Sequence, residues 1–113
     1  LTVLRSGGIK TAIGSSSKNA VYILKRVGLS AYFDAVSDGN GIINSKPDPE
    51  VFERAAKLLG VECGSCLVVE DAEAGIIAAK SAGMYAAAIG DAKKQKNADY
   101  QIDMLSEILE LFL

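Results

Sequence analysis

The stretch Ser45–Phe52, SKPDPEVF, places a lysine immediately before the start of a helix. We predict Asp48 as the N-cap of this helix and Pro49 as its first residue, because a short carboxylate accepts free backbone amides and proline tolerates the first turn. Lys46 would then end a loop. A lysine in this position can be an ordinary surface residue, so the motif alone leaves a structural and a functional role open.

The stretch Val68–Ile76, VVEDAEAGI, leads from an apolar run directly into two adjacent carboxylates, Glu70 and Asp71. Two neighbouring carboxylates repel each other and lose solvation unless a cation lies near them. Carboxylate oxygens suit Mg²⁺, which proteins usually hold by one or two carboxylates together with water and phosphate. We therefore predict Glu70 and Asp71 as Mg²⁺ ligands. The alternative is that Asp71 only caps the following helix.

Apolar runs and helical periodicity alternate along the chain, which predicts an α/β fold with a parallel sheet flanked by helices. The expected strands cover residues 11–15, 35–37, 66–70, 85–89 and 100–102, and the expected helices cover residues 19–27, 49–59, 74–82 and 104–111. Ligands of such sheets bind beyond the carboxyl ends of the strands. We therefore expect Ser15, Lys46 and the Glu70–Asp71 pair to meet at one edge.

Residues 14–19, GSSSKN, join the first expected strand to a helix. Small residues at such a junction allow backbone amides to approach an oxyanion, and the start of a helix favours negative charge. This predicts a phosphate-binding loop made by Ser15, Ser16, Ser17, Lys18 and Asn19. An ordinary serine N-cap followed by a polar turn explains the same letters equally well.

The composition narrows the classes of function. The chain has 113 residues, half of them apolar, a net charge of -2 and no histidine. This predicts one domain over residues 1–113, argues against nucleic-acid binding, and excludes chemistry that depends on histidine. No apolar run reaches the roughly 20 residues of a membrane span, so we expect a cytoplasmic protein without a membrane partner. Cys63 and Cys66 lack a second ligand pair for zinc, and we interpret them as structural.

Four segments together resemble the C-terminal part of the core domain in the haloacid dehalogenase-like superfamily, closest to the β-phosphoglucomutases. They are GSSSKN at 14–19, YFDAVSDGNGI at 32–42, SKPDPEVF at 45–52 and VVEDAEAGI at 68–76. The resemblance implies that Ser15 and the backbone after it bind the transferring phosphoryl group, while Ser17, Lys18 and Asn19 bind the other phosphate of a sugar phosphate. It further implies that Lys46 bridges the nucleophilic carboxylate and the phosphoryl oxygens, and that Glu70 and Asp71 bind Mg²⁺.

The resemblance also implies groups that this sequence lacks. The family carries an Asp-x-Asp strand with the nucleophile and the general acid/base, followed by a helical cap, and no Asp-x-Asp occurs here. We therefore expect an incomplete Rossmann-like core without its first strand and cap, with a gap between the strands at 11–15 and 66–70. The complete protein would convert β-glucose 1-phosphate to glucose 6-phosphate through an aspartyl-phosphate.

Two alternatives stay open beside the mutase. One is a sugar-phosphate phosphatase of the same superfamily. The other is a non-catalytic fragment that pairs with another chain, either a separate N-terminal segment or a second copy meeting it at exposed sheet edges. The residues from Leu1 to Ile9 suggest the tail of a helix, so we interpret the chain as the later portion of something longer.

Overall fold

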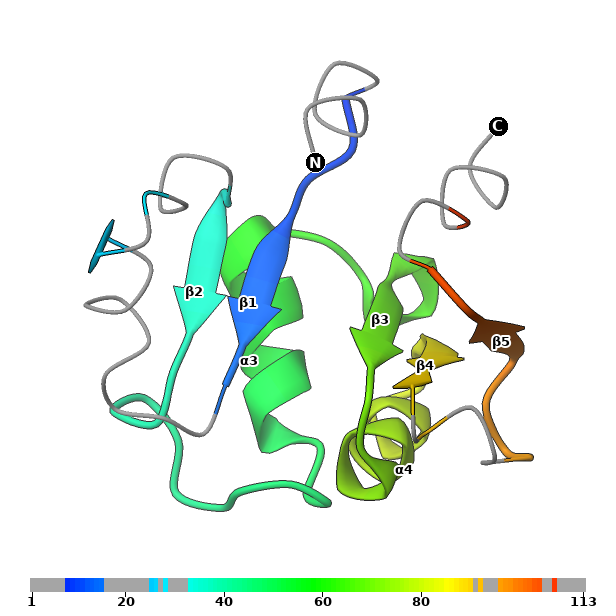
Figure 1. The fold of residues 1–113 in the computed structure, drawn as a ribbon. Helices are drawn as coiled ribbons and strands as arrows, with labels where there is room; N and C mark the ends of the chain where they lie inside the picture. Colours follow the sequence, from blue (N-terminus) through cyan, green and yellow to red (C-terminus); the bar gives the residue numbers. More distant parts are fainter. Residues whose placement is uncertain are drawn as a thin grey trace.

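The computed structural model describes residues 8–15, 25–26, 28, 33–90, 92, 96–104 and 107. Strands and helices alternate through this part of the chain (Figure 1). The strands are β1 (Ala12–Gly14), β2 (Ala35–Ser37), β3 (Leu67–Glu70), β4 (Tyr85–Ile89) and β5 (Tyr100–Ile102). The helices are α3 (Glu50–Leu59), α4 (Glu73–Ser81) and the short 3₁₀ helix η2 (Cys63–Ser65). The predicted α/β class and all five predicted strands are confirmed.

The strands form two parallel sheets, β1–β2 and β3–β4–β5. β1 and β3 are therefore edge strands, and Figure 1 shows them as neighbours that point the same way. Within the described residues no strand pairs with the free edge of either one, which agrees with the expected gap. β3 is apolar along Leu67–Val69 and yet only half-buried. An apolar strand with an unpaired edge is prone to pair with another chain.

Helix α3 packs on β1 and β2 through one apolar face, made by Val51, Phe52, Ala55 and Ala56. Burial of a side chain such as Val51 or Phe52 stabilises the fold by about 2 kcal/mol. The buried Ser37 hydroxyl donates to the carbonyl of Val51 (2.7 Å) and so ties β2 to this helix. Leu59, the last residue of this helix, is only half-buried, whereas Val51 is fully buried.

The structure contradicts the predicted N-cap Asp48 of α3, and also the alternative in which Asp71 caps α4. α3 begins at Glu50 with Pro49 as its N-cap, and no side chain caps it, although the Asp48 carboxylate still accepts the amide of Glu50 (2.9 Å). α4 begins at Glu73 with Ala72 as its N-cap and again without a side-chain cap. The interpretation of Asp71 as a capping residue is therefore contradicted, and its exposed carboxylate needs another explanation.

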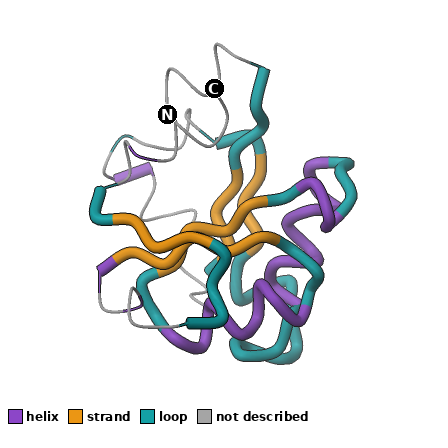
Figure 2. Tube along the Cα trace, turned by 90° about the vertical axis from the view of Figure 1, so that its right-hand side faces the viewer, coloured by secondary structure: helices purple, strands orange, loops and turns teal. Residues whose placement is uncertain are grey.

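Helix α4 and strand β4 contribute several buried alanines to one apolar cluster. Ala78 and Ala79 of the helix and Ala86 and Ala88 of the strand are all fully buried. They belong to a cluster that also includes Ile76, which has no exposed surface. Alternation along β4 turns Ala87 to the other face, where it packs with Ile102 of β5. Figure 2 shows α3 and α4 on the same side of the strands.

Two expected helices, 19–27 and 104–111, fall almost entirely outside the described residues. The same holds for Ser16, Ser17, Lys18 and Asn19 of the expected phosphate loop. None of the described helices has the length and apolar character that crossing a membrane requires.

Candidate functional site at the carboxyl edge of the strands

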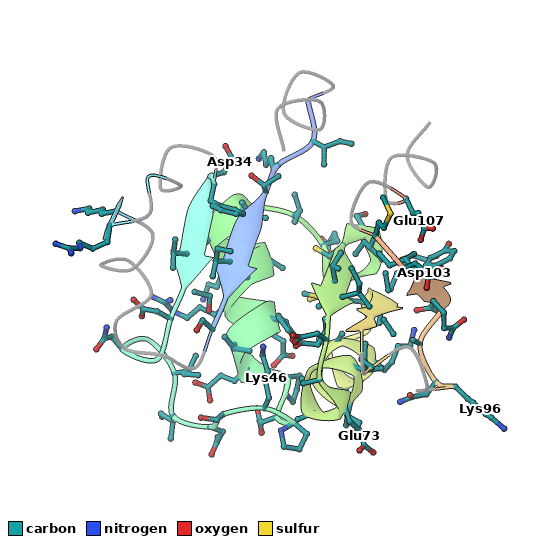
Figure 3. The ribbon with its side chains drawn as sticks, in the orientation of Figure 1. Asp34, Lys46, Glu73, Lys96, Asp103 and Glu107 are labelled. Atoms are coloured by element: carbon teal, nitrogen blue, oxygen red, sulfur yellow. The ribbon has the colours of Figure 1, made fainter. Side chains whose placement is uncertain are left out.

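Lys46 lies at the carboxyl ends of the strands, between the two sheets (Figure 3). Its Nζ pairs with Glu70 Oε2 at 2.9 Å and donates to the carbonyl of Gly14 at 3.4 Å. Gly14 ends β1 and Glu70 ends β3, so one ammonium group links the two facing edge strands. The same Nζ lies 4.9 Å from the centre of the Phe52 ring, where a cation is attracted to the ring face.

The loop before Lys46 is held by a side chain of α3. Glu50 accepts the backbone amides of Ile43 (2.5 Å) and Asn44 (3.1 Å), and the amide of Asp48 donates to the carbonyl of Ser45 (3.1 Å). Hydrogen bonds to a carboxylate are stronger than those between neutral groups. These contacts fix the backbone on both sides of Lys46, so the ammonium group reaches the site from a constrained loop.

Glu70 and Asp71 differ in their surroundings although they are adjacent. The Glu70 side chain is 11% exposed, pairs with Lys46 through Oε2, and accepts the amide of Asp71 at Oε1 (3.2 Å). Asp71 is exposed and lies next to Gly90, the residue after β4. The predicted repulsion between the two carboxylates is thus relieved on one side by a lysine and on the other by solvent.

Ser15 lies at this edge as well, because its amide donates to the carbonyl of Ser37 (2.8 Å) just beyond β1. The structure therefore brings together the ends of β1, β2 and β3 with Lys46 and Glu70. Sequence reasoning expected Ser15, Lys46 and the carboxylate pair here, and their convergence on one edge is what the structure shows. It missed the Gly14 carbonyl and the Phe52 ring as contacts of Lys46.

A family model described as haloacid dehalogenase-like hydrolase matches residues 1–83. The chain belongs to this family.

Named relatives are similar to this chain in sequence. The β-phosphoglucomutase of Bacillus subtilis is 41% identical over 112 residues, which are 98% of this chain and 50% of that protein. A fructose-1-phosphate phosphatase of Escherichia coli is 41% identical over 75 residues, which are 65% of this chain and 40% of that protein. The chain spans about half the length, or less, of these relatives.

Solved structures agree with this assignment. A β-phosphoglucomutase from Clostridium difficile matches with a TM-score of 0.88 and 36% identity, over 96% of this chain and 51% of that one. A phosphatase of the haloacid dehalogenase-like family from Thermococcus onnurineus also gives a TM-score of 0.88, with 34% identity over 96% of this chain and 53% of that one. These two structures, one a mutase and one a phosphatase, are therefore equally similar to this chain in fold.

Members of this family use Mg²⁺, and the donor set at the edge fits part of a Mg²⁺ site. Glu70 and Asp71 offer carboxylate oxygens, the ligands that this cation prefers. Glu70 already holds a cation, the Lys46 ammonium group, in a place where a metal would gain the same attraction. Within the described residues no group of three or more carboxylate, thiol or imidazole side chains converges, so these two carboxylates form only part of a coordination shell.

Two perturbed groups lie away from this edge. The pKa of Asp99 is lowered, first because Lys80 donates to its carboxylate (2.8 Å) and second because the amide of Ala86 does so too (2.8 Å). The pKa of Cys66 is raised, chiefly by burial and in addition by the nearby Cys63 thiol. Both cysteines are free and half-buried, at the amino end of β3.

Proposed function

We propose that this chain supplies part of a Mg²⁺-dependent phosphoryl-transfer site of the β-phosphoglucomutase type, which converts β-glucose 1-phosphate to glucose 6-phosphate through an aspartyl-phosphate. The observation that carries the proposal is the Lys46 ammonium group, held between Gly14 of β1 and Glu70 of β3. Support comes also from the similarity to the Bacillus subtilis enzyme over 98% of this chain.

Each residue has a distinct task in this proposal. Lys46 stabilises negative charge on the transferring phosphoryl group, a contribution that is largest in the transition state. Ser15 and the backbone after it bind the phosphoryl oxygens, and Ser17, Lys18 and Asn19 bind the second phosphate of the sugar. Glu70 and Asp71 would hold Mg²⁺, which neutralises phosphate charge when bound. Because two carboxylates are only part of its shell, we expect affinity of the chain alone on the order of millimolar.

The nucleophile must come from another segment, of the same protein or of a second chain. No acidic residue of these 113 follows an apolar strand in an Asp-x-Asp pattern, and covalent phosphoryl transfer requires a carboxylate in line with phosphorus. Among the described residues no strand pairs with the free edges of β1 and β3, and we propose that the strand carrying the nucleophile lies between them. We propose such an N-terminal segment as the partner, with self-association through these edges as the competing outcome and the cytoplasm as the location.

A sugar-phosphate phosphatase is the second candidate. It is favoured by the Escherichia coli fructose-1-phosphate phosphatase, whose identity to this chain is the same 41%. The two activities differ in whether a sugar hydroxyl or water accepts the phosphoryl group. That choice depends on how the sugar is enclosed, which involves groups beyond this edge.

The proposal is tested by supplying a segment that carries the nucleophile. The chain is mixed with the portion of the Bacillus subtilis β-phosphoglucomutase that it does not match, and assembly is checked by size-exclusion chromatography. Glucose 6-phosphate and free phosphate are then measured with Mg²⁺, β-glucose 1-phosphate and a trace of sugar bisphosphate. We expect glucose 6-phosphate from the assembled mixture, almost none with Lys46→Ala, and full activity with the control Lys80→Ala.

Each other outcome has a defined meaning. Free phosphate without glucose 6-phosphate favours the phosphatase. An assembled mixture that forms neither product refutes both activities. Turnover by the chain alone that survives repurification and disappears in Asp71→Asn would show that the site is complete without a partner.

A further inference from the structure

Gly75 is a buried glycine in the first turn of α4, and its surroundings are unusual. A Cβ built on it would overlap Cγ, Cδ and Oε2 of Glu70, and its three nearest atoms all belong to that one side chain. The overlap includes Cγ, which lies close to the backbone. A small rotation at the end of the Glu70 side chain therefore cannot relieve it.

The path of the Glu70 side chain explains the contact. Glu70 ends β3, and its side chain lies against the first turn of α4 before Oε2 reaches Lys46 at 2.9 Å. The positive end of the helix dipole favours a carboxylate in this place. Any side chain at position 75 would occupy the volume through which Glu70 passes.

Helix formation itself does not favour glycine at this position. Glycine is a poor helix former, and the neighbouring small positions of α4 are alanines, including Ala74, Ala78 and Ala79. Its φ is not in the left-handed region that requires glycine. The surroundings of position 75 supply a reason, because the atoms nearest to a side chain there would be those of Glu70.

We propose that Gly75 is a positioning residue for the Glu70 carboxylate. By leaving this volume empty it lets Glu70 lie across the start of α4, where the carboxylate pairs with Lys46 and is presented toward the carboxyl edge of the strands. The part of the proposal that concerns metal binding rests on the proposed function, whereas the steric part does not.

A double-mutant cycle tests the steric part through stability alone. Gly75→Ala is made in the native chain and again in Glu70→Ala, and the urea midpoint of unfolding is measured for all four proteins. We expect Gly75→Ala to lower the midpoint when Glu70 is present and to raise it when Glu70 is replaced, because alanine is the better helix former once the overlap is gone. A lower midpoint in both backgrounds, or a higher one in both, overturns the proposal.

The second readout is the affinity for Mn²⁺, a paramagnetic substitute for Mg²⁺, measured by electron paramagnetic resonance. We expect Gly75→Ala to weaken Mn²⁺ binding by about tenfold or more, as when a group that orients a metal ligand is lost, and to have no further effect after Glu70→Ala. The control Gly64→Ala adds a methyl group that meets nothing within 4 Å, and should leave the affinity unchanged.

The outcomes separate this inference from the proposed function. A folded Gly75→Ala protein with native Mn²⁺ affinity refutes the positioning role toward metal, even if the reconstituted enzyme is active. A sign change in the urea midpoints confirms the steric role, even if no phosphoryl transfer is found.

Discussion

Replacing Lys46 by methionine should increase the amount by which Mg²⁺ stabilises the folded chain. Methionine keeps an apolar stem against Phe52 but removes the charge that pairs with Glu70. The Glu70 carboxylate then loses its paired cation, although its side chain is mostly buried and only 11% exposed. The negative charge of Glu70 is then no longer neutralised by Lys46, and a divalent cation that binds there can neutralise it.

The magnitude follows from the burial of the pair. Exposed ion pairs contribute at most about 1 kcal/mol, and breaking a fully buried one costs about 3–5 kcal/mol. With side chains 20% and 11% exposed, the Lys46–Glu70 pair lies between these limits. We expect Lys46→Met to lower the free energy of unfolding without metal by about 1–2 kcal/mol.

Mg²⁺ should recover much of this loss. Binding only to the folded state at ten times Kd adds about 1.4 kcal/mol to the free energy of unfolding. Because the ammonium group no longer competes for Glu70, we expect Mg²⁺ to bind Lys46→Met about tenfold more tightly than the native chain, equivalent to about 1.4 kcal/mol. The same variant should be inactive after reconstitution, so tighter metal binding and lost turnover would occur together.

The assay is urea unfolding of both proteins across a Mg²⁺ series, with Lys80→Met as the matched control. Lys80 also forms an ion pair, with Asp99 at 2.8 Å, near the start of β4, where Asp99 accepts the amide of Ala86. Its loss should leave the Mg²⁺ response unchanged. If Mg²⁺ stabilises the native chain as much as it stabilises Lys46→Met, the idea that lysine and metal compete for Glu70 is refuted.

Two further predictions concern groups away from the site. Because the pKa of Asp99 is lowered by Lys80 and Ala86, its stabilising contribution is present at neutral pH and is lost as the pH falls below about 4. Between about pH 5 and pH 3 the Asp99→Asn variant should therefore lose less stability than the native chain. The difference should be under about 1 kcal/mol, because the Lys80–Asp99 pair is partly exposed. An equal loss of stability in the two proteins would contradict this. Burial raises the pKa of Cys66, so less of its thiol is in the reactive thiolate form. In the Cys63→Ser variant at about pH 8, iodoacetamide should therefore alkylate Cys66 more slowly in the folded chain than in urea. Equal rates would show that burial does not affect this thiol.

The sequence predicted the fold well where the signal was long and apolar. The runs that became β3 and β4 contain only apolar residues apart from their ends, and such runs leave few alternatives to buried parallel strands. The meeting of Lys46 with Glu70 was also predictable, because carboxyl ends of parallel strands share an edge. No partner contact had to be known for this inference.

The helix starts were not predictable from the same letters. Capping depends on backbone angles, and Pro49 adopts a helical conformation while Ala72 is extended, which moved both N-caps one residue beyond the expected aspartates. The contact of Gly75 with Glu70 was hidden for another reason. It depends on the direction that the Glu70 side chain takes, which the sequence does not show. An isolated glycine in a helical pattern indicates only that some other group approaches the backbone closely.

At the contact between α4 and β4, which is lined with alanines, a smaller residue should be tolerated better than a larger one. Ala79 and Ala86 have no exposed surface and each contributes a single methyl group, so truncation to glycine removes little volume. Enlargement is different, because an overpacked interior forces backbone shifts that cost about 1–3 kcal/mol. Since Glu70 precedes this helix in the chain and the first turn of α4 lies against its side chain, such a shift would also reach the carboxylate. Variation in natural or selected sequences should therefore avoid larger residues at these positions, although no reacting group lies there.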